Sequence, residues 1–324
     1  MGNDIVKLKK KKELGILSGW SFASSKVTGR RPHQEDEFKN TKDFFAIFDG
    51  HGGPKCSEFL RDNFLEYCSS WSNENVITDS FLKIDKQLEE DEITDGSCAI
   101  MVKILEKKTY ASTLSGSNDY EIICVNLGDS RCIFWDGQKV VPLSKDQKPT
   151  NPGEKKRIEE AGVCVSAGMV SNDLAVLRAF GDFRHKKNEG KSQREQSVIA
   201  VPEIKKIVVP KKSNGKRFIV LASDGVWDVM SNEEVCEFIN YRLKEQEKKV
   251  EYLKNRLERM KEVHMNYLNE REESGKEKDV FEHEVEEDFY THEGLSMICD
   301  ELIHECVISR KSNDNTTVTI ILFD

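Results

Sequence analysis

The chain has 324 residues, and its 58 acidic against 49 basic side chains leave a formal net charge of -9. This length permits about two domains, but apolar runs typical of strands recur from the first fifty residues to the last ten, which favours one large domain. An acidic chain lacks the basic face that nucleic-acid binding requires. The nine cysteines include no Cys-x-x-Cys pair, and no run approaches the length of a membrane span. We therefore expect a reduced protein of the cytoplasm or the nucleus.

Residues 1–18 are predicted to form a basic N-terminal tail, because Lys7 is followed by four consecutive lysines at 9–12. The start Met1-Gly2 permits acylation of Gly2, which together with the lysines would attach the chain to a membrane. Position 6 is Val, where the acylation motif requires Ser or Thr. A solvated basic tail is therefore the preferred interpretation.

The first predicted elements are strands over 20–29 and 44–48, with the polar stretch 30–43 between them expected to be a loop. Pro54 suits the first turn of a helix, and a second helix is predicted over 76–88. Runs rich in β-branched and aromatic residues then predict four short strands, at 98–105, 122–127, 132–135 and 139–142.

Residues 184–197 are predicted to be a basic polar loop. Further on, Ser231 with Glu234 three residues later forms a capping box that begins a helix over 232–243. The remaining predicted elements are an apolar strand over 216–222, a helix over 295–307 and a final strand over 316–323.

Residues 244–288 are predicted to be a charged insertion, helical or disordered, because about half of them are charged. Within it, apolar residues at alternating spacings of three and four form a short seam. The apolar seam consists of Val250, Leu253, Leu257 and Met260, extended weakly by His264 and Tyr267. Because there are fewer than three clean heptads, a surface helix packed on its own domain is preferred, and a dimer through residues 244–288 is the alternative.

Four of the apolar strand-like runs have an acidic residue at a tight turn beside one end: Asp49, Asp129, Asp224 and Asp314. An Asp-Gly pair after a strand is by itself a strong hairpin signal. The neighbours of these acids indicate more than turns. Asp49 begins Asp-Gly-His-Gly-Gly, whose glycines allow close approach of the backbone to a ligand.

Short motifs rich in acids and glycines recur along the chain in a fixed order. They are Arg31…Glu35-Asp36, Asp49-Gly50-His51-Gly52-Gly53, Asp95-Gly96-Ser97, Gly128-Asp129-Ser130-Arg131, Arg178-Ala179-Phe180-Gly181-Asp182, Asp224-Gly225 and Asp314-Asn315-Thr316. In the order of these motifs the chain resembles the metal-dependent serine/threonine protein phosphatases of type 2C, over roughly residues 20–243 and 291–323. The resemblance implies a catalytic domain over 19–324. Its expected fold is α+β, with two antiparallel β-sheets packed face to face and flanked by α-helices.

The resemblance implies hydrolysis of phosphoserine and phosphothreonine in proteins, by water activated between two Mg²⁺ or Mn²⁺ ions and without a phospho-enzyme intermediate. Arg31 would hold the phosphate, His51 would be the general acid, and Asp36 would orient the site. The implied ligands are Glu35, Asp49, the Gly50 carbonyl, Asp224 and Asp314, with Asp146 and Asp228 for a third, weaker ion.

The basic loop maps to a flap beside the active site of this family, where Lys186, Lys187, Lys191 and Arg194 would engage acidic substrates; a solvated loop is the alternative. Members of the family are often monomers, and a monomer is expected here. Two other functions stay open, a catalytically inactive family member acting as a binding scaffold and a structural calcium module. All the matched metal carboxylates are present, which argues against an inactive scaffold. No EF-hand spacing occurs, which argues against a calcium module.

Overall fold

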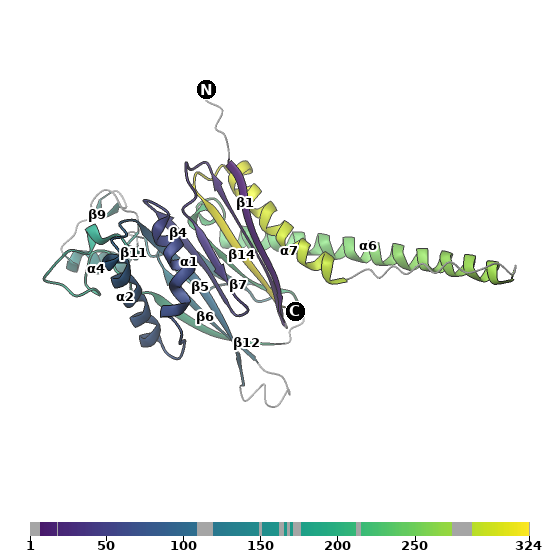
Figure 1. Cartoon of the computed structure of the whole chain (residues 1–324), viewed down its shortest axis with the longest axis horizontal. Helices are drawn as coiled ribbons and strands as arrows, with labels where there is room; N and C mark the ends of the chain where they lie inside the picture. The colour runs from purple at the N-terminus through teal and green to yellow at the C-terminus, as the bar shows by residue number, and fades with distance from the viewer. Residues whose placement is uncertain are drawn as a thin grey trace, which may run out of the picture.

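The computed structural model describes residues 7–17, 19–108, 119–148, 151–161, 165–166, 169–170, 176–211, 215–273 and 287–323. Within these ranges two antiparallel β-sheets pack face to face, and helices cover their outer faces (Figure 1). The predicted α+β fold is confirmed. No helix in the described ranges is both long enough and apolar enough to cross a membrane.

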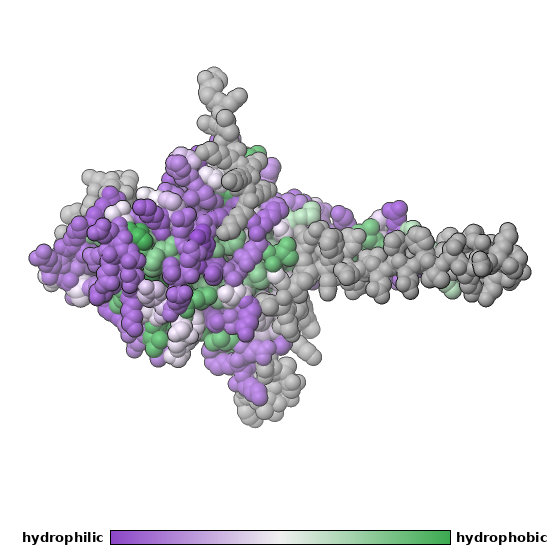
Figure 2. Space-filling model, in the orientation of Figure 1, coloured by the Kyte–Doolittle hydropathy of each residue, from purple (hydrophilic) through white to green (hydrophobic). Residues whose placement is uncertain are grey.

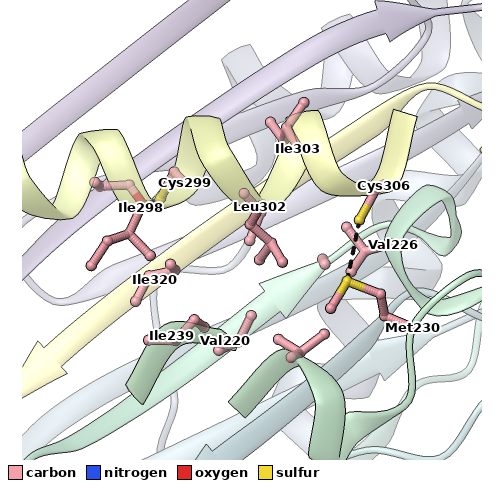
Figure 3. Close-up of a cluster of buried hydrophobic side chains, with 14 of the residues drawn as sticks. Val220, Val226, Met230, Ile239, Ile298, Cys299, Leu302, Ile303, Cys306 and Ile320 are labelled. Atoms are coloured by element: carbon pink, nitrogen blue, oxygen red, sulfur yellow. Dashed lines mark hydrogen bonds between the residues drawn. The ribbon is translucent and has the colours of Figure 1, made fainter. Parts of the chain in front are cut away.

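The first sheet has the strand order β1-β2-β14-β13-β7-β8. Helices α6 (Asn232–Glu273) and α7 (Glu287–His304) pack on its outer face through a cluster that includes Val220, Ile239 and Leu302 (Figure 3). The strands are β1 Lys7–Leu17, β2 Trp20–Gly29, β14 Thr316–Phe323, β13 Arg217–Ala222, β7 Arg131–Trp135 and β8 Val140–Pro142.

The second sheet has the order β12-β6-β5-β4-β3, and the short strand β11 also pairs with β5. Helices α1 (Lys55–Tyr67) and α2 (Glu74–Glu90) cover it, with Phe64 and Phe81 in the cluster beneath them. The strands are β12 Glu203–Pro210, β6 Asp119–Leu127, β5 Gly96–Lys107, β4 Phe44–His51, β3 Glu37–Asn40 and β11 Phe180–Gly181.

Strand β4 explains why the two layers form, because its side chains alternate between the faces of the sheet. Phe45 and Ile47 belong to the core between the two sheets, whereas Phe44 and Phe48 belong to the core beneath the helices. Full burial of each such side chain contributes about 1.5–3 kcal/mol. The part of the strand that leads to Asp49 is therefore held between two packed cores.

The predicted basic tail over residues 1–18 is wrong for residues 7–17, which form edge strand β1 and pair with β2 in register from Lys10 to Leu17. Backbone hydrogen bonds do not depend on side-chain charge, and lysines are common on edge strands because they discourage further pairing. Lys12 also forms an ion pair with Asp300 of α7. Gly2, the predicted acylation site, lies outside the described residues.

Helix α6 continues unbroken for 42 residues, from the predicted helix over 232–243 into the charged insertion. Its outer part projects away from the body of the domain (Figure 1), and Tyr252 and Met260 are 64% and 61% exposed. The expectation that this helix packs on its own domain is therefore wrong for its outer part. Residues 274–286 of the insertion lie outside the described residues.

The other predicted elements are present with shifted ends, and the predicted loop over 30–43 contains β3. Helix α7 is followed by a π-helical turn, Glu305–Ser309. The body presents a mostly hydrophilic face in Figure 2, with hydrophobic side chains scattered over it. Among the described residues, this face therefore shows no large continuous hydrophobic patch.

Candidate active site

A cavity of about 710 Å³ brings together the acids that the sequence places at distant strand ends. Glu35 lies just before β3, Asp49 lies in β4, Asp129 follows β6, Asp224 follows β13 and Asp314 precedes β14. These segments belong to both sheets. Convergence of acids from both layers is the arrangement that the sequence motifs predict.

Three of these acids are close enough to share a cation. Asp49, Asp129 and Asp224 each offer a carboxylate oxygen, and the three atoms lie within 4.8 Å of one another. Burial, reinforced by the neighbouring carboxylates, raises the pKa of Asp49 and of Asp224 well above the ordinary range. A cation among these acids would offset both causes and favour their charged forms.

Asp224 offers a further oxygen atom that suits a cation. Its Oδ1 atom is buried and accepts no hydrogen bond from any described residue, and such a buried acceptor is costly to leave unpaired. The donors here are all oxygens, the preference of hard ions such as Mg²⁺ and Mn²⁺. The residues present therefore fit a divalent metal.

Backbone packing places Glu35 beside the cavity. The Glu35 amide donates to Asn315 Oδ1 at 2.7 Å, and the Asn315 amide group donates to the carbonyls of Thr28 and His33 at 2.9 and 3.0 Å. Gly50 lies against this segment, because a Cβ atom there would collide with the Glu35 carbonyl. A side chain at position 50 would therefore push Glu35 away from Asp49.

Arg31 reaches the cavity from the same segment. Its Nη2 atom donates to Asp314 Oδ2 at 2.5 Å. Partial burial would lower the pKa of Arg31, but the charges of Asp314, Asp224 and Glu35 outweigh it and raise that pKa. The guanidinium is therefore permanently charged at the rim of an acidic cluster, in the planar form that matches a phosphate.

Asp36 does not line the cavity but lies behind it, 1% exposed. It accepts hydrogen bonds from Ser223 Oγ at 3.0 Å and from Thr317 Oγ1 at 2.6 Å. Burial raises the pKa of Asp36 to about 6. Since Ser223 precedes Asp224 and Thr317 lies near Asp314, Asp36 joins the two segments that carry these acids.

His51 is held by Asp182, with Nε2 to Oδ2 at 2.6 Å. Burial alone would lower the pKa of His51, but the hydrogen bond and charge of Asp182 outweigh it, and the pKa is raised. Asp182 has a positive φ of 53°, which is rare for a residue with a side chain. The role of Asp182 was missed from the sequence, although it lies in a motif that the sequence singled out.

The structure does not support Asp146 as a metal ligand. Both of its carboxylate oxygens accept from Arg131, at 2.8 and 2.7 Å, and it does not line the cavity. Asp228 also lies off the cavity, paired with Lys148 at 3.2 Å. Asp129 is buried, lines the cavity and lies near Asp49 and Asp224. Its position at a strand end was the available sequence signal.

The prediction that the basic loop engages substrates is wrong for some of its side chains. Lys186 Nζ donates to Asp85 at 2.7 and 2.9 Å and to the Ala179 carbonyl, so it fastens the loop to α2 rather than facing a substrate. Arg194 pairs with Asp79 of α2 at 3.2 Å. Two basic side chains of this loop segment line the cavity, Lys187, which was predicted, and Arg184, which was not. Lys191 lines a neighbouring pocket of about 390 Å³.

The family model described as Protein phosphatase 2C matches residues 13–259, more than half of the chain. Protein phosphatase 1A of Bos taurus is 32% identical over 269 residues, which cover 74% of this chain and 66% of that protein. Protein phosphatase 1B of Bos taurus is 34% identical over 258 residues, 71% of this chain and 49% of that protein. The chain thus spans between half and two thirds of the length of these relatives. It belongs to the protein phosphatase 2C family of metal-dependent serine/threonine phosphatases.

Solved structures show the same fold. A phosphatase from a pathogenic strain of Toxoplasma gondii superposes with a TM-score of 0.71 at 20% identity, covering 97% of this chain and 96% of its own. A C. elegans sex determining protein superposes with a TM-score of 0.62 at 21% identity, covering 95% of this chain and 66% of its own. The resemblance inferred from the motifs is confirmed.

Proposed function

We propose that this chain hydrolyses phosphoserine and phosphothreonine in proteins. The observation that carries the proposal is the group of oxygens of Asp49, Asp129 and Asp224 within 4.8 Å of one another, beside Arg31 and His51 in one cavity. This cavity combines the three needs of phosphate ester hydrolysis, which are a cation site, a phosphate clamp and a proton donor.

Five residues are proposed to hold two Mg²⁺ or Mn²⁺ ions, with a third, weaker site at Asp129 and Asp224 in place of Asp146 and Asp228, which both lie off the cavity. When bound, such ions would neutralise phosphoryl oxygens and lower the pKa of a bound water. The proposed ligands of the two main ions are Glu35, Asp49, the Gly50 carbonyl, Asp224 and Asp314.

Arg31 is proposed to bind the phosphoryl group through its planar fork, which gives a bidentate geometry that Lys does not reproduce. His51 is proposed to protonate the leaving serine or threonine oxygen. Asp182 engages Nε2, so Nδ1 is the ring nitrogen assigned to this transfer. The raised pKa of His51 favours the protonated ring that a general acid requires.

We propose direct attack by water, without a phospho-enzyme. Cys98 also lines the cavity, but burial and the charge of Asp129 raise the pKa of its thiol well above the ordinary value. A thiol that stays protonated is a poor nucleophile. This supports hydrolysis in one displacement rather than through a covalent intermediate.

The proposed setting is a monomer in the cytoplasm or the nucleus that acts on phosphoproteins. The eight described cysteines are all buried thiols, which agrees with a reducing compartment. Contact with a membrane through Gly2 is a separate and weaker hypothesis.

A phosphothreonine peptide, assayed for phosphate release with Mn²⁺ and then with excess chelator, tests the proposal. Turnover that stops with chelator and returns with added metal is expected, and Asp224→Asn is expected to abolish it. Peptide binding without turnover under every metal condition would instead establish an inactive scaffold.

A further inference from the structure

The outer part of α6 exposes one side of the apolar seam. Val250 is half-buried and lines a groove of about 340 Å³ between α6 and α7, together with Met297, which is 50% exposed. Leu253 is half-buried, and Met260, farther out, is 61% exposed. The seam therefore begins in a groove at the body of the domain and continues along the projecting helix (Figure 1).

A projecting helix of this kind gains stability from a partner. Residues 250–273 rise about 36 Å along the axis at about 1.5 Å per residue. Most helix stability in proteins comes from packing of an apolar face rather than from intrinsic propensity, and Met260 on this segment is 61% exposed. A matching apolar face laid on the seam would supply that packing.

The charged residues beside the seam indicate the charge of a partner helix. If Val250 and Leu253 take the a and d positions of a heptad, the adjacent e and g positions face the partner helix. Acidic residues of the segment, such as Glu251 and Glu258, then lie at b positions on the far side. The four flanking positions are all basic, namely Lys249, Lys254, Arg256 and Lys261.

A second copy of the chain and an anionic membrane both fit the charges beside the seam poorly. A second copy in parallel would place Lys249 opposite Lys254 and Arg256 opposite Lys261, and the antiparallel arrangement also sets basic against basic residues. An anionic membrane prefers a helix with a uniformly basic polar face, whereas the far side of this one carries acids. The remaining match is an acidic helix.

We propose that the seam of α6 is a docking site for a helix of another protein, with apolar residues at three-four spacing and Asp or Glu beside them. None of the seam side chains that the structure describes lines the catalytic cavity, so docking leaves the cavity accessible. A docked substrate protein would meet the active site at a raised effective concentration.

The probe is a labelled synthetic helix of about 21 residues with Leu at a and d and Glu at e and g, and its control has Lys at e and g. Fluorescence anisotropy with the full chain is expected to show about tenfold tighter binding of the Glu peptide, weakened severalfold by raised salt. Reversal of Lys254 and Arg256 to Glu is expected to invert this preference while keeping the helix. Leu253→Asp with Met260→Asp is expected to remove binding.

Phosphate release from a small phosphopeptide is expected to be unchanged in these variants, which separates docking from catalysis. Equal binding of both peptides, or of neither, would overturn the proposal. So would a dimer in sedimentation that the double Asp variant dissolves, or anionic vesicles that displace the Glu peptide. Binding that starts only after replacement of residues 274–286 by a neutral linker would assign the seam to this chain's own acidic segment, and would also overturn it.

Discussion

His51 Nε2 lies 2.6 Å from Asp182 Oδ2, which joins two residues that are 131 positions apart in the chain. Gly96 lies against the pair, because a Cβ atom there would collide with both side chains. The ring is therefore fixed by a carboxylate on one side and a bare backbone beside it. The orientation and the charge of the His51 ring therefore depend on Asp182 and Gly96, which are far from His51 in the sequence.

Replacement of His51 by Ala is expected to slow hydrolysis of a phosphoserine peptide by about 100-fold or more, because the leaving alkoxide loses its proton donor. An aryl phosphate, whose leaving group needs no proton, is expected to lose much less. The measurement is kcat for both substrates at saturating Mn²⁺. Equal losses would reject the role of general acid.

Asp182→Asn is expected to move the alkaline limb of the activity profile to lower pH. Asp182 raises the pKa of His51, so removal of its charge lets the ring lose its proton earlier as pH rises. The check is kcat against pH for a phosphoserine peptide, with the variant's folding verified by circular dichroism. A uniform drop at every pH, without a shift, would mean that Asp182 serves structure only.

The metal-free protein is expected to be more stable at about pH 5 than at about pH 7.5. The pKa values of Asp49, Asp129 and Asp224 are raised in the folded state, chiefly by burial. The folded chain therefore binds more protons than the unfolded chain, and its stability falls as pH rises from the ordinary pKa through the raised one. Urea unfolding with chelator measures this slope.

Addition of Mn²⁺ is expected to reverse that slope, because a cation replaces the protons among the carboxylates. Asp224→Asn provides the matched control, since it removes one of the crowded charges and is expected to flatten the slope without metal. A metal-free stability that rises with pH would contradict this account of the cluster.

Asp129→Asn and Asp146→Asn separate the two candidates for the third ion. Asp129 lines the cavity, so its replacement is expected to raise the Mn²⁺ concentration for half-maximal activity by about tenfold. Asp146 pairs with Arg131, so its replacement is expected to cost about 1 kcal/mol of stability and leave the metal requirement unchanged. The reverse outcome would restore Asp146 to the site.

Local patterns were enough to predict most elements and the acidic strand ends. The strand before Asp49 alternates between two apolar faces, and the glycines after it signal a close backbone approach. The phosphatase family was also evident from motif order. Such features depend on residues a few positions apart, which a sequence displays directly.

The structure departs from the sequence predictions where partners are distant in the chain. Arg131 occupies both carboxylate oxygens of Asp146, and Lys186 turns inward because Asp85 of α2 lies within reach. Likewise, the lysine-rich segment over 7–17 becomes a strand because β2 offers an unpaired edge. These outcomes follow from the partner and not from the residue itself.

The sequence by itself determined the residue types, the strand ends that carry acids and the amphipathic period of the long helix, because these are properties of short stretches of chain. Only the tertiary structure decided which acids meet, which cations face the cavity and that α6 leaves the body of the domain. Charges interact through space, and the distances between them exist only once the two sheets have packed.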